Sequence, residues 1–173
     1  RCILLLGCEY ALLRPEFKKL RKKALEKRKC ITQIKNIFVS MGGSDDNNVT
    51  YDILEQLDSK KYNIVVVLGA YSLHNEMIKN YAIDKNIEVI IGANNMAELM
   101  LNADLAIGAS GSTNWERLCL GLPSLIFTVA KNQRKFSKIL DKHGLIRLLG
   151  DASDKNSVSA IRDNILSIDD LRE

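Results

Sequence analysis

Cysteine is scarce in this sequence, and its spacing is not that of a metal site or a redox motif. The 173 residues contain four cysteines, none of them in a CxxC arrangement: Cys2, Cys8, Cys30 and Cys119. The common zinc motifs are therefore excluded, and we expect no metal and no cofactor. Unpaired, reduced thiols are typical of cytoplasmic proteins, and we expect that localisation.

Long apolar runs are also missing. The longest ones, such as 64–68 (IVVVL), are far too short to span a bilayer, so we expect no membrane partner. The chain reaches Gly7 before a signal-peptide core could develop. It begins with Arg1 instead of Met, and we therefore expect the sequence to be a piece of a longer one.

Histidine is too rare to support a Ser–His–Asp arrangement. His74 stands at the start of a predicted helix, and His143 at the end of another, where a cation is favoured by the helix dipole. Neither has an obvious partner in the sequence, so we expect structural or solvated roles for both. The single tryptophan, Trp115, is expected to pack inside the fold.

Basic residues are concentrated in one segment, 18–29 (KKLRKKALEKRK). It holds eight basic residues and one acid and so carries +7, which leaves −3 for the rest of a chain whose net charge is +4. Such a helix either contacts nucleic acid or membrane, or is a solvated helix that connects two lobes. No aromatic residue interrupts it, and we therefore expect no nucleic-acid partner.

After residue 30 the sequence alternates between strand and helix patterns. An apolar content of 46% in 173 residues fits one globular domain. The alternation predicts right-handed crossovers and hence an α/β fold, a Rossmann-like parallel sheet with helices on both faces. The expected strands are 36–40, 62–68, 87–91, 104–107 and 124–129, and the expected helices are 49–57, 73–82, 96–102, 113–120, 134–143 and 157–167.

The first 30 residues do not follow this repeat. Residues 3–6 look like a strand, and 10–17 (YALLRPEF) like a loop that passes Pro15 into the basic helix. We therefore expect 1–30 to be the end of a preceding domain with a basic interdomain connector. Residues 31–173 then form the Rossmann-like domain.

Ligands of parallel sheets bind outside the carboxyl ends of the strands, which draws attention to the loops 41–48, 92–95 and 108–114. In the first, Gly42 and Gly43 allow close backbone approach, and Ser44 follows them. These residues suit phosphate oxygens near a helix N-terminus. The alternative is a turn followed by an Asp or Asn helix cap, because Asp45 and Asp46 would repel a phosphate.

The loop 108–113 (GASGST) is a stronger candidate. Ser110, Ser112 and Thr113 can donate hydrogen bonds to phosphate oxygens, and Gly111 removes a Cβ that would block approach. Glu116 follows one turn into the next helix. It either closes a capping box with Thr113 or accepts hydrogen bonds from a ribose diol, and the residues alone leave both readings open.

Three motifs occur in order at compatible spacing: IFVSMGGSD-x-x-N, then NMAELM-x-x-ADLAIGASGST-x-WE-x-x-x-x-GLPSL, then NQ. They resemble the C-terminal domain of GT-B-fold UDP-sugar enzymes and are similar in outline to the MurG glycosyltransferases. The segments YALLRPEF and SMGGSD are more similar still to the PseG family, the UDP-sugar hydrolases of pseudaminic acid biosynthesis. The resemblance covers residues 3–150.

This resemblance implies a role for each matching position. The glycines and serine at 42–44 would lie by the diphosphate or the substrate cleft. Backbone groups at 91–93 would meet the uracil, and residues 110–113 would hold the diphosphate. Glu116 would accept from the ribose, and the NQ pair would contact the hexose. The residues implied in UDP or substrate binding are Gly42, Gly43, Ser44, Asn48, Ile91, Gly92, Ala93, Ser110, Gly111, Ser112, Thr113, Glu116, Asn132 and Gln133.

The implied activity is hydrolysis of the anomeric C–O bond of UDP-2,4-diacetamido-2,4,6-trideoxy-β-L-altropyranose, with release of UDP. The alternative is the donor-binding domain of a GT-B UDP-glycosyltransferase. The catalytic residue is unknown, because the general base of the family is a histidine of an N-terminal domain that this sequence lacks. We expect that domain to be the partner, and this chain alone to be inactive.

Overall fold

The fold is centred on one parallel sheet. The structure is a computed structural model that describes residues 2–4 and 7–170. Six strands pair in the order β3-β2-β1-β4-β5-β6, all parallel. They are β1 (Asn36–Ser40), β2 (Asn63–Leu68), β3 (Ile87–Ile91), β4 (Leu105–Ala109), β5 (Ser124–Thr128) and β6 (Arg147–Asp151).

The strand order reverses between β1 and β4. The chain first builds outward from β1 through β2 to β3, and then returns to the other side of β1 and builds outward again. In doubly wound sheets, crossovers that leave in opposite directions create a crevice outside the carboxyl ends of the two central strands, which here are β1 and β4. This position, the switch point, is the expected ligand site of a doubly wound sheet.

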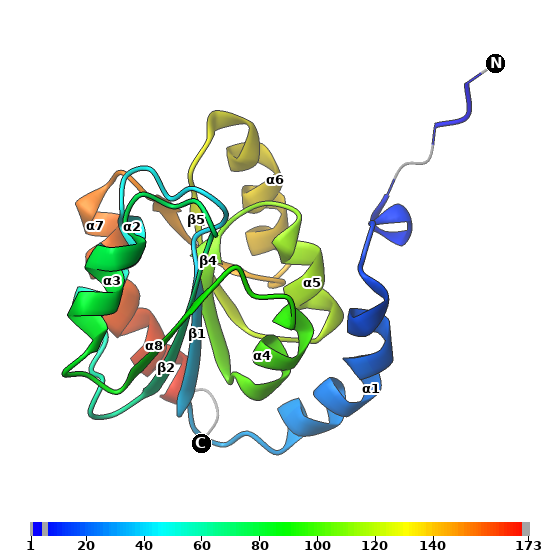
Figure 1. Ribbon diagram of the computed structural model, residues 1–173. Coiled ribbons are helices and arrows are strands. Elements are labelled where there is room, and N and C mark those ends of the chain that lie inside the picture. The colour runs from blue at the N-terminus through cyan, green and yellow to red at the C-terminus, as the bar shows by residue number, and fades with distance from the viewer. Residues whose placement is uncertain (1, 5–6, 171–173) are drawn as a thin grey trace.

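Helices cover both faces, as the sequence predicts. One face carries α2 (Val49–Gln56), α3 (Asn75–Ala82), α7 (Lys155–Ser159) and α8 (Ile161–Asp170), and these lie together on the left of Figure 1. The other carries α1 (Pro15–Lys29), α4 (Met96–Asn102), α5 (Thr113–Cys119) and α6 (Lys131–Lys142). Alternate residues of the strands supply the two cores: Ile37 and Val39 face the first layer, and Phe38 faces the second.

The basic helix α1 packs on the sheet layer instead of being solvated all round. Phe17 and Ala24 are fully buried against α4 and α5. Lys27 Nζ donates to the carbonyl of Leu101 at 3.1 Å, and Arg28 Nη2 to that of Met100 at 2.8 Å. These cations satisfy the free carbonyls at the end of α4, so part of the basic charge is structural. Its role as an interdomain connector stays a prediction.

Three expectations about elements need correction. Residues 3–4 do not form a strand, and the rest of the predicted strand, 5–6, lies outside the described residues. The strand β6 was not predicted. The closing helix is broken at Ala160 into α7 and α8. A short 3-10 helix, Cys8–Tyr10, precedes α1. Within the described part of the chain, no helix has the length and apolarity needed to cross a membrane.

Candidate functional site

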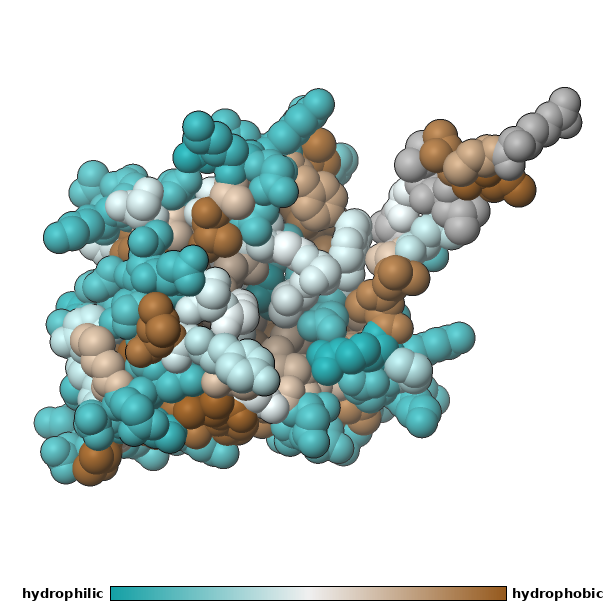
Figure 2. Space-filling model, turned by 45° about the horizontal axis from the view of Figure 1, so that its top comes forward, coloured by the Kyte–Doolittle hydropathy of each residue, from teal (hydrophilic) through white to brown (hydrophobic). Residues whose placement is uncertain are grey.

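The switch point is formed by Ser40 and Gly108, the last residues that pair between β1 and β4. A Cβ built on Gly108 would lie 2.3 Å from the Ser40 carbonyl oxygen, so only glycine lets the two strand ends approach this closely. The loops that follow both strands are therefore side by side. Figure 2 looks down on this edge at an angle and shows residues of intermediate hydropathy across its centre.

The loop after β1 ends in a helix cap. The Asp45 carboxylate accepts from the backbone N–H groups of Val49 and Thr50, both at 2.9 Å. These are the free donors at the start of α2, so they are already satisfied. The cap reading of this loop is confirmed, and a phosphate at the α2 N-terminus is excluded because Asp45 occupies that position.

Glycines in these loops fall into two groups. Gly69, like Gly108, is required for packing: a Cβ on Gly69 would lie 1.8 Å from the Gly43 carbonyl oxygen. Cβ atoms on Gly42, Gly43 and Gly111 would meet nothing within 4 Å. The backbone at position 42 has φ of 98°, a conformation that favours glycine over other residues. Gly43 needs glycine for neither packing nor backbone conformation, so its open face suits the close approach of a ligand.

The loop after β4 is held by four buried polar side chains that form one hydrogen-bonded chain. Arg117 Nη2 donates to Asn114 Oδ1 at 2.6 Å, and Asn114 Nδ2 donates to Ser110 Oγ at 3.0 Å. The Ser110 and Ser137 hydroxyls are 2.7 Å apart, and Ser137 Oγ donates to the carbonyl of Gln133 at 2.8 Å. We call these four residues the Arg117–Ser137 network. It links α5 to the first turn of α6.

The direction of every bond in this network is determined by its two ends. A guanidinium can only donate, and a carbonyl can only accept. The Ser137 proton goes to the Gln133 carbonyl, so the hydrogen between the two hydroxyls belongs to Ser110. The backbone N–H of Ser110 donates to the Phe127 carbonyl at 2.7 Å. Ser110 therefore has no donor left for a phosphate, which corrects its predicted role: it supports the loop from inside.

The exposed side of this loop is formed by Gly111, Ser112 and Thr113. Ser112 is exposed, and the other two are half-buried. Neither Ser112 nor Thr113 donates a side-chain hydrogen bond within the described structure. Their hydroxyls are available to a ligand, in contrast to that of Ser110.

Glu116 does not cap its helix. The cap position of α5 is Ser112, so a capping box would need the acid at residue 115. Instead, Glu116 Oε1 accepts from Arg14 Nε at 3.2 Å and Nη2 at 3.0 Å. The Arg14 guanidinium also lies 5.1 Å from the centre of the Phe17 ring. The capping-box reading is wrong, and Glu116 joins the start of α1 to α5.

Arg117 is a fully buried cation with unused donors. Its Nη2 also donates to the Ala109 carbonyl at 2.8 Å, but Nε and Nη1 have no hydrogen-bond partner among the described residues. Burial lowers the pKa of Arg117 to about 10, and the negative charge of Glu116 opposes that shift. The residue is therefore charged at neutral pH.

The remaining predicted residues lie at three places. Ile91, Gly92 and Ala93 end the edge strand β3, where the Gly92 N–H donates to the Leu68 carbonyl at 2.9 Å. Asn48 turns toward α3, with its Nδ2 at 3.3 Å from Met77 Sδ. The binding role of Asn48 stays a prediction.

Asn132 and Gln133 lie in the first turn of α6. Asn132 is exposed, whereas Gln133 Oε1 accepts from the Val129 N–H at 2.9 Å and so closes the turn before the helix. Through its carbonyl, Gln133 is also the last acceptor of the Arg117–Ser137 network. Hydrogen bonds through Ser137 thus connect the loop predicted to hold the diphosphate with the turn predicted to contact the hexose.

The two histidines and the tryptophan were expected to have structural or solvated roles, and their contacts are as follows. His74 precedes α3, and its Nε2 lies 3.1 Å from the Asp46 carbonyl oxygen. His143 follows α6 and is exposed. Trp115 packs on Phe136, with ring centres 5.4 Å apart.

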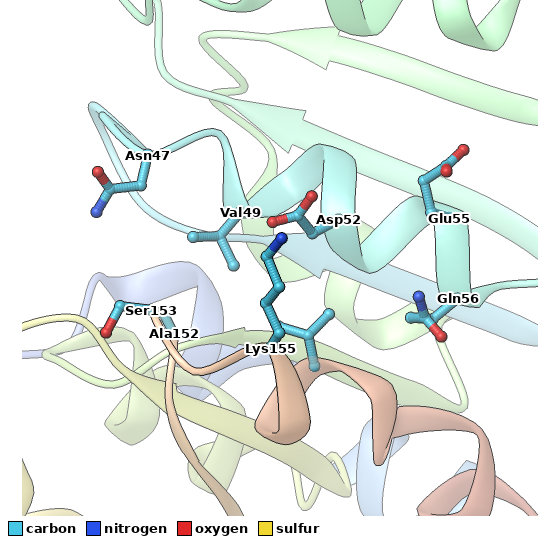
Figure 3. Close-up of a pocket in the computed structure, with 9 residues that line it drawn as sticks. Asn47, Val49, Asp52, Glu55, Gln56, Ala152, Ser153 and Lys155 are labelled. Carbon is cyan, nitrogen blue, oxygen red and sulfur yellow. The ribbon is translucent and has the colours of Figure 1, made fainter.

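Two cavities of similar size are present, and neither is lined by Ser40 or Gly108 of the switch point. One, of about 410 Å³, opens between the loops after β1, β5 and β6; Ser44, Lys131 and Arg134 are among its lining residues. The other, of about 430 Å³, lies between α2 and α7. In Figure 3 the Lys155 side chain of α7 points toward Asp52 of α2 in this second cavity. In the part of the chain that the structure describes, no cluster of three metal-ligating side chains occurs.

The strand order, the helices on both faces and the small-residue loops at the switch point define a doubly wound α/β domain of the type found as the C-terminal half of GT-B enzymes. The family follows from the sequence match. Residues 15–163 match the glycosyltransferase family 28 C-terminal domain, and the chain belongs to this family.

Curated relatives extend the comparison. The chain is 38% identical over 135 residues to the uncharacterized protein MJ1062 of Methanocaldococcus jannaschii, covering 75% of this chain and 28% of that protein. It is 32% identical to the spore coat polysaccharide biosynthesis protein SpsG of Bacillus subtilis, covering 83% and 43%. It is 29% identical to the UDP-2,4-diacetamido-2,4,6-trideoxy-β-L-altropyranose hydrolase of Campylobacter jejuni, covering 83% and 50%. The chain thus spans half of these relatives or less.

Solved structures agree on the fold. The spinosyn rhamnosyltransferase SpnG superposes with a TM-score of 0.60 at 15% identity, covering 78% of this chain and 38% of that one. MurG of Acinetobacter baumannii superposes with a TM-score of 0.57 at 16% identity, covering 86% and 52%. The predicted fold class, a Rossmann-like C-terminal domain of the GT-B fold, is confirmed.

Proposed function

We propose that this chain is the nucleotide-binding half of a UDP-sugar hydrolase. The observation that carries the proposal is the open face of Gly43 after β1 together with the available hydroxyls of Ser112 and Thr113 after β4, on the two loops that begin at the switch point of a family 28 domain. Glycine at an unstrained, unpacked position suits close contact with a bulky polar ligand. Loops at a switch point are where such sheets bind nucleotides.

In this proposal the phosphates contact Gly43, Gly111 and the hydroxyls of Ser112 and Thr113. Glu116 accepts hydrogen bonds from the ribose, with Oε2 facing the ligand because Oε1 holds both bonds from Arg14. Backbone groups of 91–93 contact the uracil. Exposed Asn132 reaches the hexose, and Gln133 shapes the turn beneath it.

The proposed reaction is the attack of water on the anomeric carbon of UDP-2,4-diacetamido-2,4,6-trideoxy-β-L-altropyranose, which breaks the C–O bond to the diphosphate. Negative charge then grows on the departing UDP oxygen. Hydrogen-bond donors held in place before the reaction stabilise that charge. The 29% identity to the Campylobacter jejuni hydrolase supports this substrate.

A second function competes because the matching family is named for glycosyltransferases. A transferase would use the same nucleotide site with a sugar acceptor in place of water. Incubating the whole protein with the UDP-sugar, with and without candidate acceptors, tests both. Free sugar and UDP formed in the absence of acceptor is the expected result, and release that requires an acceptor would replace the hydrolase proposal with the transferase.

The chain by itself should bind UDP weakly and turn over no substrate, because the proposed general base belongs to another domain. Titration with UDP followed by NMR measures the binding, since it detects millimolar affinity. Turnover by the isolated chain would show that the reacting groups are in this half. It would contradict the proposal that the general base belongs to another domain.

A further inference from the structure

Among the residues that the structure describes, Arg117 is the one buried cation, and the proposed contacts do not use it. The residue is 1% exposed, and its guanidinium reaches from α5 to the Ala109 carbonyl at the end of β4. Taking a guanidinium out of water is strongly unfavourable unless acceptors or opposite charge compensate it. Here two acceptors serve five donors, the Ala109 carbonyl and Asn114 Oδ1, and Nε and Nη1 lack partners among the described residues.

The guanidinium is located directly at the switch point. Arg117 Nη1 lies 2.9 Å from the position that a Cβ on Gly108 would occupy, and that same Cβ would be 2.3 Å from the Ser40 carbonyl oxygen. Nη1 therefore sits against the last paired residues of β1 and β4. The loops after both strands begin at these residues, so the guanidinium lies next to the start of both loops.

No carboxylate forms an ion pair with Arg117 itself among the described residues. Glu116 acts on Arg117 through its charge, but its hydrogen bonds come from Arg14, which also lies 3.4 Å from Glu16 Oε1. The Arg117 guanidinium is therefore a buried cation with no carboxylate in direct contact. Such a cation attracts an anion, and burial keeps its field from being screened by salt.

We propose that Arg117 is a positioning residue for the phosphate groups of the nucleotide, whose negative charge its buried guanidinium attracts from beneath the crevice. The inference rests on the proposed nucleotide site and adds the residue that selects a phosphorylated ligand over a nucleoside. It also assigns two tasks to one side chain. Nη2 holds the loop through Asn114, while the positive charge acts on the ligand.

The test compares UDP with uridine, because only the phosphate contribution should depend on Arg117. NMR titrations of the chain use both ligands on the unmodified protein, Arg117→Met and Arg117→Lys. We expect Arg117→Met to lose about tenfold or more in UDP affinity, as for a lost charged partner, with uridine affinity unchanged. Arg117→Lys keeps the charge and should retain most of the preference for UDP.

Arg147→Met is the matched control. Arg147 is exposed on β6 at the amino end of the sheet, with its Nε bonded to Asn164, so this variant removes one positive charge far from the crevice. It should leave both affinities unchanged. An equal loss for UDP and uridine in Arg117→Met, or no loss for either, would overturn the inference.

A measurement on the unmodified chain covers the case in which Arg117→Met does not fold. The Arg117 Nε–H resonance, protected by burial, should shift when UDP is added and stay in place with uridine. A resonance unmoved at UDP saturation rejects the role of Arg117 while the nucleotide site stands. If neither ligand perturbs any resonance of the chain, the proposed function itself fails.

Discussion

Replacing Glu116 by glutamine gives the sharpest test of the ribose contact. Both bonds from Arg14 fall on Oε1, and a carboxylate has about four acceptor positions, so Oε2 can accept both hydroxyls of a ribose. Glutamine keeps the size of the side chain and removes the charge. A hydrogen bond to a charged group contributes about 1.5–3 kcal/mol, and the remaining amide oxygen recovers part of it.

We therefore expect Glu116→Gln to lose about 1–3 kcal/mol of UDP binding free energy, which is about 5- to 150-fold in Kd. The fold should survive the change. The Arg14–Glu116 pair is partly exposed, with 42% and 17% of the two side chains accessible, and such pairs contribute about 0.2–1 kcal/mol. Thermal unfolding of the variant checks this separately from binding.

The assay is a titration of unmodified chain and variant with UDP and with 2′-deoxy-UDP. If Glu116 accepts hydrogen bonds from the ribose hydroxyls, 2′-deoxy-UDP binds the unmodified chain more weakly than UDP does. In Glu116→Gln this difference in affinity between the two ligands should disappear. Glu98→Gln is the matched control, since Glu98 is an exposed acid near the start of α4. A folded Glu116→Gln variant with unchanged UDP affinity would refute the ribose contact.

Three further predictions concern stability. Gly108→Ala should lower the free energy of unfolding by about 1–3 kcal/mol, measured by denaturant titration, because its Cβ would meet backbone 2.3 Å away at Ser40. Asp45→Ala should cost about 0.5–2 kcal/mol in the same assay, since it removes the cap of α2. The hydrogen bond from Arg134, with those from Ser153, lowers the pKa of Asp151 from 3.8 to about 2. Asp151 therefore stabilises the fold above pH 3.8 and loses this effect as the pH falls toward 2, and Asp151→Asn should flatten stability over that window.

Much of the sheet was predictable because its strands are apolar on both faces. β1 and β3 have the predicted bounds, since each is a short run in which apolar residues dominate. α4 also has the predicted bounds, and its buried residues Ala97, Met100 and Leu101 recur at helical spacing. β6 was missed for a physical reason. It is an edge strand that pairs with β5 alone, its register shifts beside Phe127, and Gly150 within it has φ of 136°.

The location of the loops was also predictable, but not the partners of their side chains. Parallel strands bring their carboxyl ends to one edge, so the loops 41–48 and 108–114 had to be neighbours once the order was known. The Arg14–Glu116 contact joins residues 102 apart, and Ser110 meets Ser137 across 27 residues. No local spacing reports such contacts. Ser110 consequently resembled a phosphate donor in the sequence, although its hydroxyl is used inside the fold.

Arg117 shows why glycine at 108 and arginine at 117 depend on each other. Any side chain at Gly108 would collide with the guanidinium and with Ser40, so the buried charge requires that glycine. The charge in turn orients Asn114 and, through it, Ser110 and Ser137, because a guanidinium can only donate. A neutral residue at 117 would leave Asn114 free to flip its amide and reverse the donor order. The same cation thus determines the shape of the loop and the sign of the charge that the crevice attracts.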